Sequence, residues 1–247
     1  MEAYTGFAPV YDTYMDNIPY DDWADNINQL FQKYNMPMEI VCELGCGTGQ
    51  MTRRLKNKGY DMIGIDVSYD MLMEAMSTED SDGILYLCQD MRSFELYGTV
   101  GAVVSVCDSM NYLQNTEDLL TVCKLVNNYL DPKGLFIFDI KTKHYYEKLG
   151  SSTIAENREE GSFIWENDYN PKTRDNYYFL TIYQENEEGT FDRFEEEHYQ
   201  HAFTVDEVEK AIIESGLQLL EVLDVTTMET PKEDSDRLYF IAREVTK

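Results

Sequence analysis

Residues 38–140 alternate short apolar runs with amphipathic stretches, and this rhythm limits the possible fold more than any other feature of the chain. The apolar runs have the length of buried strands and lie at 38–44, 61–65, 84–88, 102–107 and 134–140. Between them, helical patterns cover 49–58, 68–76 and 116–130. Alternating strands and helices are typical of βαβ units, whose parallel strands are covered on both faces. The sequence therefore predicts an α/β protein with a Rossmann-like parallel sheet.

The pattern changes after Lys141. Residues 151–201 contain long alternating stretches separated by the turn signals Asn170-Pro171 and Glu188-Gly189, which favour antiparallel hairpins. A helix over 204–215, with a capping box at Thr204 and Glu207, precedes two final strands at 217–225 and 238–243. We therefore expect three parts, each named by its residues: an N-terminal helical cap (1–37), a core (38–150 and 202–247) and an antiparallel β insertion (151–201).

A glycine-rich loop follows the first core strand and opens a helix, in the run Glu43-Leu44-Gly45-Cys46-Gly47-Thr48-Gly49. A strand, a glycine turn and a helix N-terminus together favour a nucleotide site, because glycines let a ligand approach the backbone. The spacing is GxGxG. The third glycine of a dinucleotide fingerprint would fall at Gln50, and Glu43 is a poor neighbour for a pyrophosphate. An acid here suits a cationic ligand instead.

With this loop the chain resembles the class I S-adenosylmethionine-dependent methyltransferases. The resemblance covers 38–140 and, by strand order, 204–247, and it implies seven strands with the last antiparallel. It also implies that Asp66 holds both ribose hydroxyls and that Asp90 meets the adenine. The cofactor-binding residues expected from the resemblance are Glu43, Gly45, Cys46, Gly47, Gly49, Asp66, Val67, Met71, Gln89, Asp90, Met91 and Cys107. On other interpretations Asp66 is a helix N-cap and Asp90 a plain surface acid.

The N-terminus has the pattern Y-x-x-F-A-x-x-Y-D in Tyr4-Thr5-Gly6-Phe7-Ala8-Pro9-Val10-Tyr11-Asp12. It is similar to small bacterial methyltransferases of the sugar-amine and glycine types. In that group the N-terminal segment caps the cofactor, and an antiparallel insertion after the fifth strand forms a lid over the acceptor. The similarity adds Tyr11 and Trp23 to the expected cofactor-binding residues, although Tyr11 is equally well read as a core aromatic.

The resemblance implies transfer of a methyl group from S-adenosylmethionine to a small-molecule acceptor by in-line displacement, with release of S-adenosylhomocysteine. We expect an amine rather than a hydroxyl as acceptor, because the chain is acidic and because of the group that it resembles. An ammonium acceptor must first lose a proton. Candidate catalytic residues are Tyr112, which follows the fourth strand, and His198, although both side chains also suit ordinary packing. His198 and His201 are three residues apart on a predicted strand, so at most one of them faces the site.

The charge, cysteine and histidine content of the chain limits the kinds of partner, compartment and metal that we expect. A net charge of −27 disfavours nucleic acids and anionic membranes, because the field of the protein repels phosphates. Five cysteines without a CxxC pair predict reduced, buried thiols in a cytoplasmic protein. His198-x-x-His201 is not a known zinc pattern, so we predict no metal. We expect a monomer or homodimer. The acidic run Glu195-Glu196-Glu197 is interpreted as a solvated strand edge.

Functions of other classes stay open at this stage. One is a nicotinamide-dependent oxidoreductase, which Gln50 and Glu43 argue against. Another is a catalytically silent S-adenosylmethionine-binding partner protein, since no single side chain is indispensable for the chemistry. A tRNA or protein acceptor is a third, against which the acidity weighs.

Overall fold

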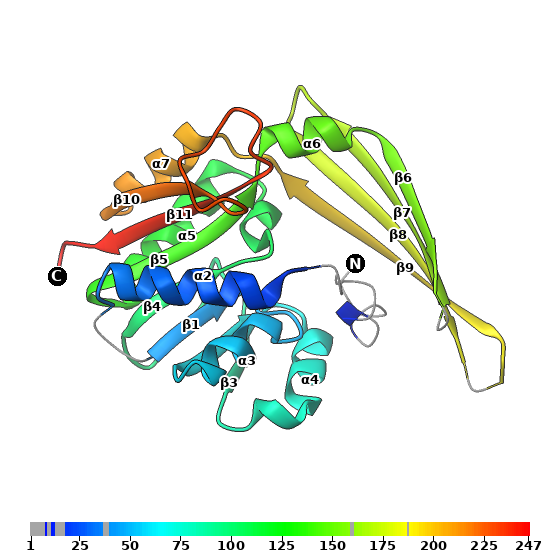
Figure 1. Ribbon diagram of the computed structural model, residues 1–247, viewed down its shortest axis with the longest axis horizontal. Helices are drawn as coiled ribbons and strands as arrows, with labels where there is room; N and C mark the ends of the chain where they lie inside the picture. The colour runs from blue at the N-terminus through cyan, green and yellow to red at the C-terminus, as the bar shows by residue number, and fades with distance from the viewer. Residues whose placement is uncertain (1–7, 9–10, 13–17, 37–39, 159–160, 187) are drawn as a thin grey trace.

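The computed structural model describes residues 8, 11–12, 18–36, 40–158, 161–186 and 188–247, and two β-sheets dominate it (Figure 1). Of the N-terminal motif, Ala8, Tyr11 and Asp12 are described, whereas Tyr4-Thr5-Gly6-Phe7 and Pro9-Val10 lie outside the described residues. No helix in the described part of the chain is long and apolar enough to cross a bilayer.

The larger sheet has seven strands in the order β10-β11-β5-β4-β1-β2-β3. Strands β1 to β5 are parallel, and β11 runs antiparallel to both of its neighbours. This arrangement confirms the predicted Rossmann-like methyltransferase sheet with its last strand antiparallel. The strands are β1 (Ile40–Leu44), β2 (Asp61–Asp66), β3 (Leu85–Cys88), β4 (Val100–Ser105), β5 (Leu130–Lys141), β10 (Leu217–Asp224) and β11 (Arg237–Glu244).

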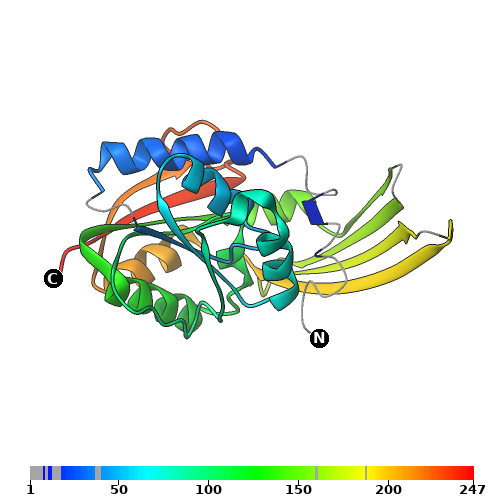
Figure 2. The same ribbon diagram turned by 90° about the horizontal axis from the view of Figure 1, so that it is seen from below.

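Helices cover both faces of this sheet, as Figure 2 shows with α2 on one side and α5 and α7 on the other. On the first face Ile27 and Leu55 are completely buried, and on the second Val122 and Ile212 are. The two apolar clusters explain why the central strands are continuous apolar runs. The helices are α2 (Tyr20–Lys33), α3 (Gln50–Asn57), α4 (Tyr69–Ser77), α5 (Thr116–Tyr129) and α7 (Val205–Glu214), with 3₁₀ turns η1 (Glu79–Ser81) and η2 (Ser109–Tyr112).

Helix caps follow the sequence signals. The Ser68 hydroxyl accepts a hydrogen bond from the Met71 N–H at 3.3 Å and caps α4. Asn115 caps α5, and Thr204 with Glu207 forms the predicted capping box at the start of α7. Because Ser68 is the cap, the alternative in which Asp66 is the N-cap of α4 is wrong.

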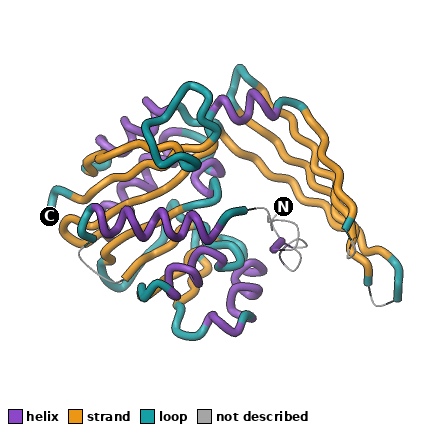
Figure 3. The backbone as a smooth tube through the Cα atoms, in the orientation of Figure 1, coloured by secondary structure: helices purple, strands orange, loops and turns teal. Residues whose placement is uncertain are grey.

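The smaller sheet is antiparallel, in the order β6-β7-β8-β9, and confirms the hairpins predicted for residues 151–201. Figures 1 and 3 show it projecting away from the larger sheet, to which α6 connects it. The bounds are α6 (Lys143–Leu149), β6 (Ser152–Asn157), β7 (Gly161–Asn170), β8 (Asp175–Glu185) and β9 (Phe191–His201).

Asn111 joins the two sheets where the chain leaves the core and returns to it. Its fully buried side-chain amide donates to the carbonyls of Lys141 (3.2 Å) and His201 (2.9 Å). Its oxygen accepts from the N–H of Lys141 at 2.8 Å. The end of β5 and the end of β9 are therefore held side by side, and the smaller sheet is anchored at its base.

Three sequence expectations need correction. Strand β5 begins at Leu130 rather than Gly134, because Leu130 already pairs with Val100 across an irregularity that accommodates Pro132. Of the acidic run on the edge strand β9, Glu196 is buried, since alternation along a strand turns it to the opposite face from its exposed neighbours. All five cysteines are free, but Cys88 is exposed, because it ends the edge strand β3.

Candidate functional site

The glycine loop between β1 and α3 is fixed to the neighbouring strand. The N–H groups of Gly45 and Cys46 both donate to the carbonyl of Ile65, at 2.8 and 3.0 Å. Gly45, Gly47 and Gly49 all have a positive φ, which residues with a side chain rarely adopt. Backbone bonds to β2 therefore fix the start of the loop.

The three glycines differ in what a side chain would meet. A Cβ at Gly45 would lie 2.5 Å from the Ser109 hydroxyl, and one at Gly49 would lie 2.4 Å from the Tyr86 hydroxyl. At Gly47 nothing lies within 4 Å. Gly45 and Gly49 are needed for packing, whereas Gly47 leaves room on the side where a ligand can approach.

This loop forms one wall of a cavity of about 270 Å³ at the carboxyl ends of β1 and β2. Most of the residues predicted to bind the cofactor meet here, and Gly49 and Trp23 do not. The predicted residues that line this first cavity are Tyr11, Glu43, Gly45, Cys46, Gly47, Asp66, Val67, Met71, Gln89, Asp90, Met91 and Cys107, and the candidate catalytic Tyr112 lines it as well.

The Asp66 carboxylate is oriented by two backbone donors. Gly47 N–H donates to one oxygen and Ser68 N–H to the other, each at 2.8 Å. Desolvation raises the pKa of Asp66, although these donors partly oppose the effect. A carboxylate held in this way can accept a pair of hydroxyl donors from a ribose.

Glu43 lies deeper in the same wall and is only 2% exposed. Its carboxylate accepts a hydrogen bond from the Thr52 hydroxyl. Burial raises the pKa of Glu43 to about 8, and the nearby charge of Asp66 adds to the rise. A buried acid of this kind has a stronger preference for a cationic ligand than a solvated one.

Asp90 lies on the opposite wall and is paired with Arg92, whose side chain reaches both carboxylate oxygens. These bonds lower its pKa. Asp90 is therefore an ion-paired acid that lines the cavity. Its position agrees in part with each of the two interpretations of the sequence, an adenine contact and a surface acid.

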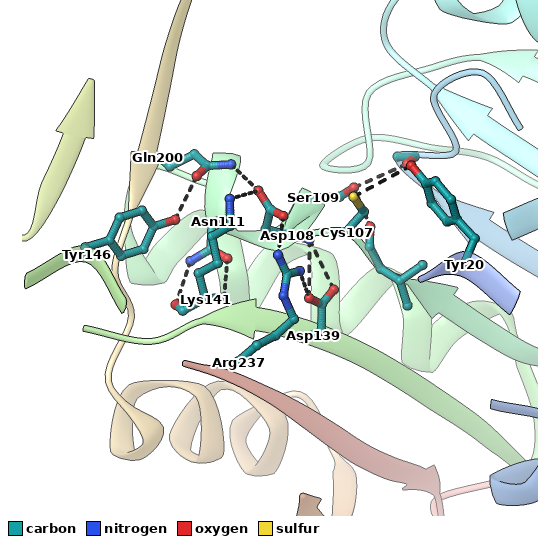
Figure 4. Close-up of polar contacts among 12 residues, drawn as sticks. Tyr20, Cys107, Asp108, Ser109, Asn111, Asp139, Lys141, Tyr146, Gln200 and Arg237 are labelled. Carbon is teal, nitrogen blue, oxygen red and sulfur yellow. Dashed lines mark hydrogen bonds and ion pairs between the residues drawn. The ribbon is translucent and has the colours of Figure 1, made fainter. Parts of the chain in front are cut away.

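Sequence reasoning missed residues at the first cavity, among them Asp12, which contacts its glycine loop, and Tyr20, which lines it. Asp12 accepts hydrogen bonds from the side chains of Thr48 (2.7 Å) and Gln50 (2.5 Å), which ties the N-terminal motif to the glycine loop. Tyr20 lines the wall, with its hydroxyl 4.0 Å from the Cys107 sulfur (Figure 4). The motif contained Asp12 and was followed by Tyr20, but no signal in the sequence indicated these contacts.

A second cavity, of about 440 Å³, lies between the core and the smaller sheet. Tyr11, Cys107 and Tyr112 line both cavities, so these three residues mark where the two meet. Trp23, expected at the cofactor, lines the second cavity, where its ring packs against the Arg237 guanidinium. The inner face of the smaller sheet supplies one wall of the second cavity, so the position of this sheet determines the shape of the cavity.

A buried ion cluster forms the core side of this second cavity (Figure 4). One carboxylate oxygen of Asp108 accepts a hydrogen bond from Arg237 at 2.8 Å. The other oxygen accepts from Gln200 at 2.6 Å and pairs with the Lys141 ammonium at 3.0 Å. Arg237 also pairs with the fully buried Asp139. Burial opposes ionisation of Asp108, but Lys141 and Arg237 hold its pKa below the usual value. The cluster contains two carboxylates and two cations.

The two histidines of β9 lie on opposite faces, as predicted. His198 lines the second cavity, 6.0 Å from Tyr112 between ring centres. His201 points away and places its Nδ1 2.7 Å from Asp175. Burial lowers the pKa of His198 to about 4, so its imidazole is neutral near pH 7 and is a weaker base than a solvated histidine.

Gly47→Ala tests whether the open space at the loop belongs to a ligand. The matched control is Gly59→Ala, another glycine of positive φ with nothing within 4 Å, which lies outside the cavity. Each change costs about 1 kcal/mol of stability through backbone strain. We expect calorimetry to show at least tenfold weaker binding of S-adenosylhomocysteine, the product of the expected cofactor, in Gly47→Ala only. Equal affinities in the two variants would contradict this assignment.

The raised pKa of Glu43 leads us to predict that a proton is released when S-adenosylmethionine binds at pH 7. With a pKa of about 8 in the free protein, Glu43 is mostly protonated at this pH. A cationic ligand in the first cavity favours the carboxylate and lowers that pKa, so close to one proton is released. Titrations in phosphate and in Tris report the proton as a difference in heat. Glu43→Gln is the control, and the same buffer dependence in both proteins would refute the prediction.

Comparison with known proteins agrees with this geometry. The family model described as "Methyltransferase domain" matches residues 41–134. YqeM of Bacillus subtilis (strain 168), which is named as a methyltransferase, is 35% identical over 243 residues, covering 97% of this chain and 96% of its own. A crystal structure of an S-adenosylmethionine-dependent methyltransferase from Clostridium acetobutylicum has a TM-score of 0.87 at 26% identity and covers 98% of this chain and 99% of its own.

A shorter match concerns amine chemistry. The dTDP-3-amino-3,4,6-trideoxy-alpha-D-glucopyranose N,N-dimethyltransferase of Streptomyces venezuelae is 29% identical over 116 residues, covering 47% of this chain and 48% of its own. These matches remove the nicotinamide-dependent oxidoreductase from consideration. The chain belongs to the class I S-adenosylmethionine-dependent methyltransferases, and S-adenosylmethionine is its methyl donor.

Proposed function

We propose that this enzyme methylates the amine of a small molecule that binds in the second cavity. The observation that carries the proposal is the junction of the two cavities at Tyr11, Cys107 and Tyr112. A donor in the first cavity and an acceptor in the second would meet there and nowhere else along the described walls. The cavity of about 440 Å³ has the size of a small-molecule site.

The first cavity is the donor site in this proposal. Asp66 accepts the ribose hydroxyls, Glu43 faces the cationic part of the donor, and Gly47 gives the ligand access to the backbone. The sulfonium of S-adenosylmethionine supplies a methyl group that is already activated toward a nucleophile. The protein then contributes mainly position and orientation, which account for about 7–11 kcal/mol in well-oriented model systems.

The acceptor site rests on the residues around the junction. Tyr112 borders both cavities, and His198 faces Tyr112 from β9. A neutral His198 takes the proton that an ammonium acceptor must lose before its nitrogen lone pair can attack. Desolvation of the ammonium in the cavity lowers its pKa toward that of the imidazole and so favours this transfer. Glu196, whose carboxylate lies 3.7 Å from His198 Nε2, stabilises the imidazolium that results.

The amine preference has support from relatives rather than from composition. The similar Streptomyces venezuelae protein is an N,N-dimethyltransferase by name. The residues that line the second cavity include three cationic side chains and two acids, so the acidity of the whole chain does not extend to this wall. The protein acts in the cytoplasm as a monomer or homodimer, and its five free cysteines support a reducing compartment.

The decisive experiment measures cofactor binding and turnover together. We expect micromolar affinity for S-adenosylhomocysteine, no affinity for NADH, and formation of S-adenosylhomocysteine with primary amines but not with matched alcohols. Asp66→Ala should weaken S-adenosylhomocysteine binding about 100-fold, since two hydrogen bonds to a charged group are lost. A thermal melt controls for folding. Turnover with alcohols alone would overturn the amine assignment, and binding without turnover across the panel would overturn the small-molecule acceptor.

His198→Gln separates proton transfer from cofactor binding. We expect kcat for an amine to fall about 100-fold, at the lower limit of general base catalysis, with S-adenosylhomocysteine affinity unchanged. His144→Gln, a substitution on α6 at a half-buried residue that lines neither cavity, is the control. Because the pKa of His198 is about 4, kcat/KM of the unchanged enzyme should show no inflection near pH 6.5. An inflection there, or full activity in His198→Gln, would rule out this role.

A further inference from the structure

The polar groups on the core side of the second cavity offer hydrogen-bond donors in excess of acceptors. Lys141 is 9% exposed, and its ammonium lies 3.0 Å from Asp108 and also interacts with the Tyr178 hydroxyl. An ammonium carries three N–H donors and a guanidinium five. Arg237 uses one nitrogen for Asp108 and another for Asp139. Both cations line the cavity with donors left over.

The acceptor oxygens of this cluster are already engaged. Both oxygens of Asp108 accept from the cluster itself, and the side-chain oxygen of Gln200 accepts from the Tyr146 hydroxyl at 2.8 Å. Asp139 is completely buried behind Arg237 and does not line the cavity. A ligand at this place therefore meets N–H groups, and the group that satisfies them must be a hydrogen-bond acceptor.

The opposite wall, on the smaller sheet, shows a related imbalance. The Trp165 indole N–H is buried without a hydrogen-bond partner in the described structure, as is the side-chain oxygen of Asn167, whereas the Tyr178 hydroxyl has the Lys141 ammonium beside it. The indole can only donate, and the phenol can donate as well. Unpaired buried donors that line a cavity are satisfied by a ligand more readily than by the apolar side chains around them.

Aromatic rings pack against the Lys141 and Arg237 side chains and hold them in place. The Lys141 ammonium lies 5.0 Å from the ring centre of Tyr145 and 5.6 Å from that of Tyr178. The Arg237 guanidinium lies 5.0 Å from the ring centre of Trp23. Further aromatic side chains that line the second cavity, Phe163 and Trp165 among them, offer apolar surface for a ring near the cations. Little conformational entropy is lost when a ligand binds side chains that are already fixed.

We infer that the acceptor carries an anionic oxygen group, a carboxylate or a phosphate, which binds Lys141 and Arg237 beside a ring that packs on the aromatic walls. The inference rests on the proposed function and names the class of its acceptor: an amine that also bears an acid. Charge-assisted bonds to oxygen are the strongest that these donors can form, and Arg237 presents the planar fork that suits such a group. The amine then extends toward Tyr112 and the donor.

The test uses probes of one ring and different charge on the protein saturated with S-adenosylhomocysteine. The probes are benzoate, phenyl phosphate, benzamide and benzylammonium. Trp23 and Trp165 are the two tryptophans of the chain, and both line the second cavity, so their indole N–H resonances report binding at this place. We expect benzoate or phenyl phosphate to bind at least ten times more tightly than benzamide. Which of the two anions binds better decides between a carboxylate and a phosphate.

Lys141→Gln locates the contact. It should reduce the preference for the anion over benzamide to less than threefold, whereas Lys148→Gln, on exposed α6, should leave the preference unchanged. Benzamide binding as tightly as both anions, or benzylammonium binding most tightly, would overturn the inference. So would an anion preference that survives in Lys141→Gln. If that variant does not fold, the ranking of probes in the unchanged protein still decides. Failure of the proposed function is separate, because it would appear as absent S-adenosylhomocysteine binding or absent methyl transfer.

Discussion

The buried ion cluster around Asp108 is the interaction on which the rest of the site depends. It joins residues that follow β4, end β5, start β11 and lie on β9. Burying one charge without a partner costs several kcal/mol, so the cluster is stable only when all its members are present. Cys107 and Asp108 both have a positive φ, and the cluster holds this unusual turn in place. That turn positions Cys107 at the junction of the two cavities.

The same interactions attach the smaller sheet to the core. Gln200 reaches Asp108 from β9, and Asn111 holds the ends of β5 and β9 together. A sheet anchored only at its base could move relative to the core. Here Gln200 and Asp108 hold β9 to the core and also line the second cavity. A substitution at either residue therefore changes both the cavity wall and the attachment of the smaller sheet.

The sequence predicted the donor side much better than the acceptor side, for a physical reason. The glycine loop and Asp66 work through backbone geometry within two neighbouring βαβ units, and local sequence spacing determines that geometry. The second cavity, which is the proposed acceptor site, needs Asp108, Lys141, Gln200 and Arg237 to converge from distant parts of the chain. Single residues in a sequence carry no signal for such a convergence, and the resemblance to other methyltransferases did not supply one.

Two members of the predicted set, Gly49 and Trp23, lie outside the first cavity, and several sequence interpretations were wrong. Gly49 has the conformation expected of the loop but faces Tyr86 rather than the cavity, and Trp23 lies one cavity away from its expected place. Helix and strand identities were correct, since hydrophobic period and capping residues determine them locally. Boundaries failed where tertiary pairing extends a strand, as at Leu130. Glu196 shows that a charge run cannot be interpreted as solvated when alternation turns one member inward.

Composition and site electrostatics are distinct properties in this protein. The net charge of −27 resides mainly on exposed acids, and it governs which macromolecules can approach. At the acceptor wall, carboxylates that are already bonded to cations no longer attract a cationic ligand, and the remaining N–H groups determine what can bind. An acceptor with both an amine and an acid would satisfy both parts of the site: its acid would meet Lys141 and Arg237, and its amine would meet the neutral His198. Whole-chain acidity alone would have suggested a simple cation, so the direction of the remaining donors is the better guide to the substrate.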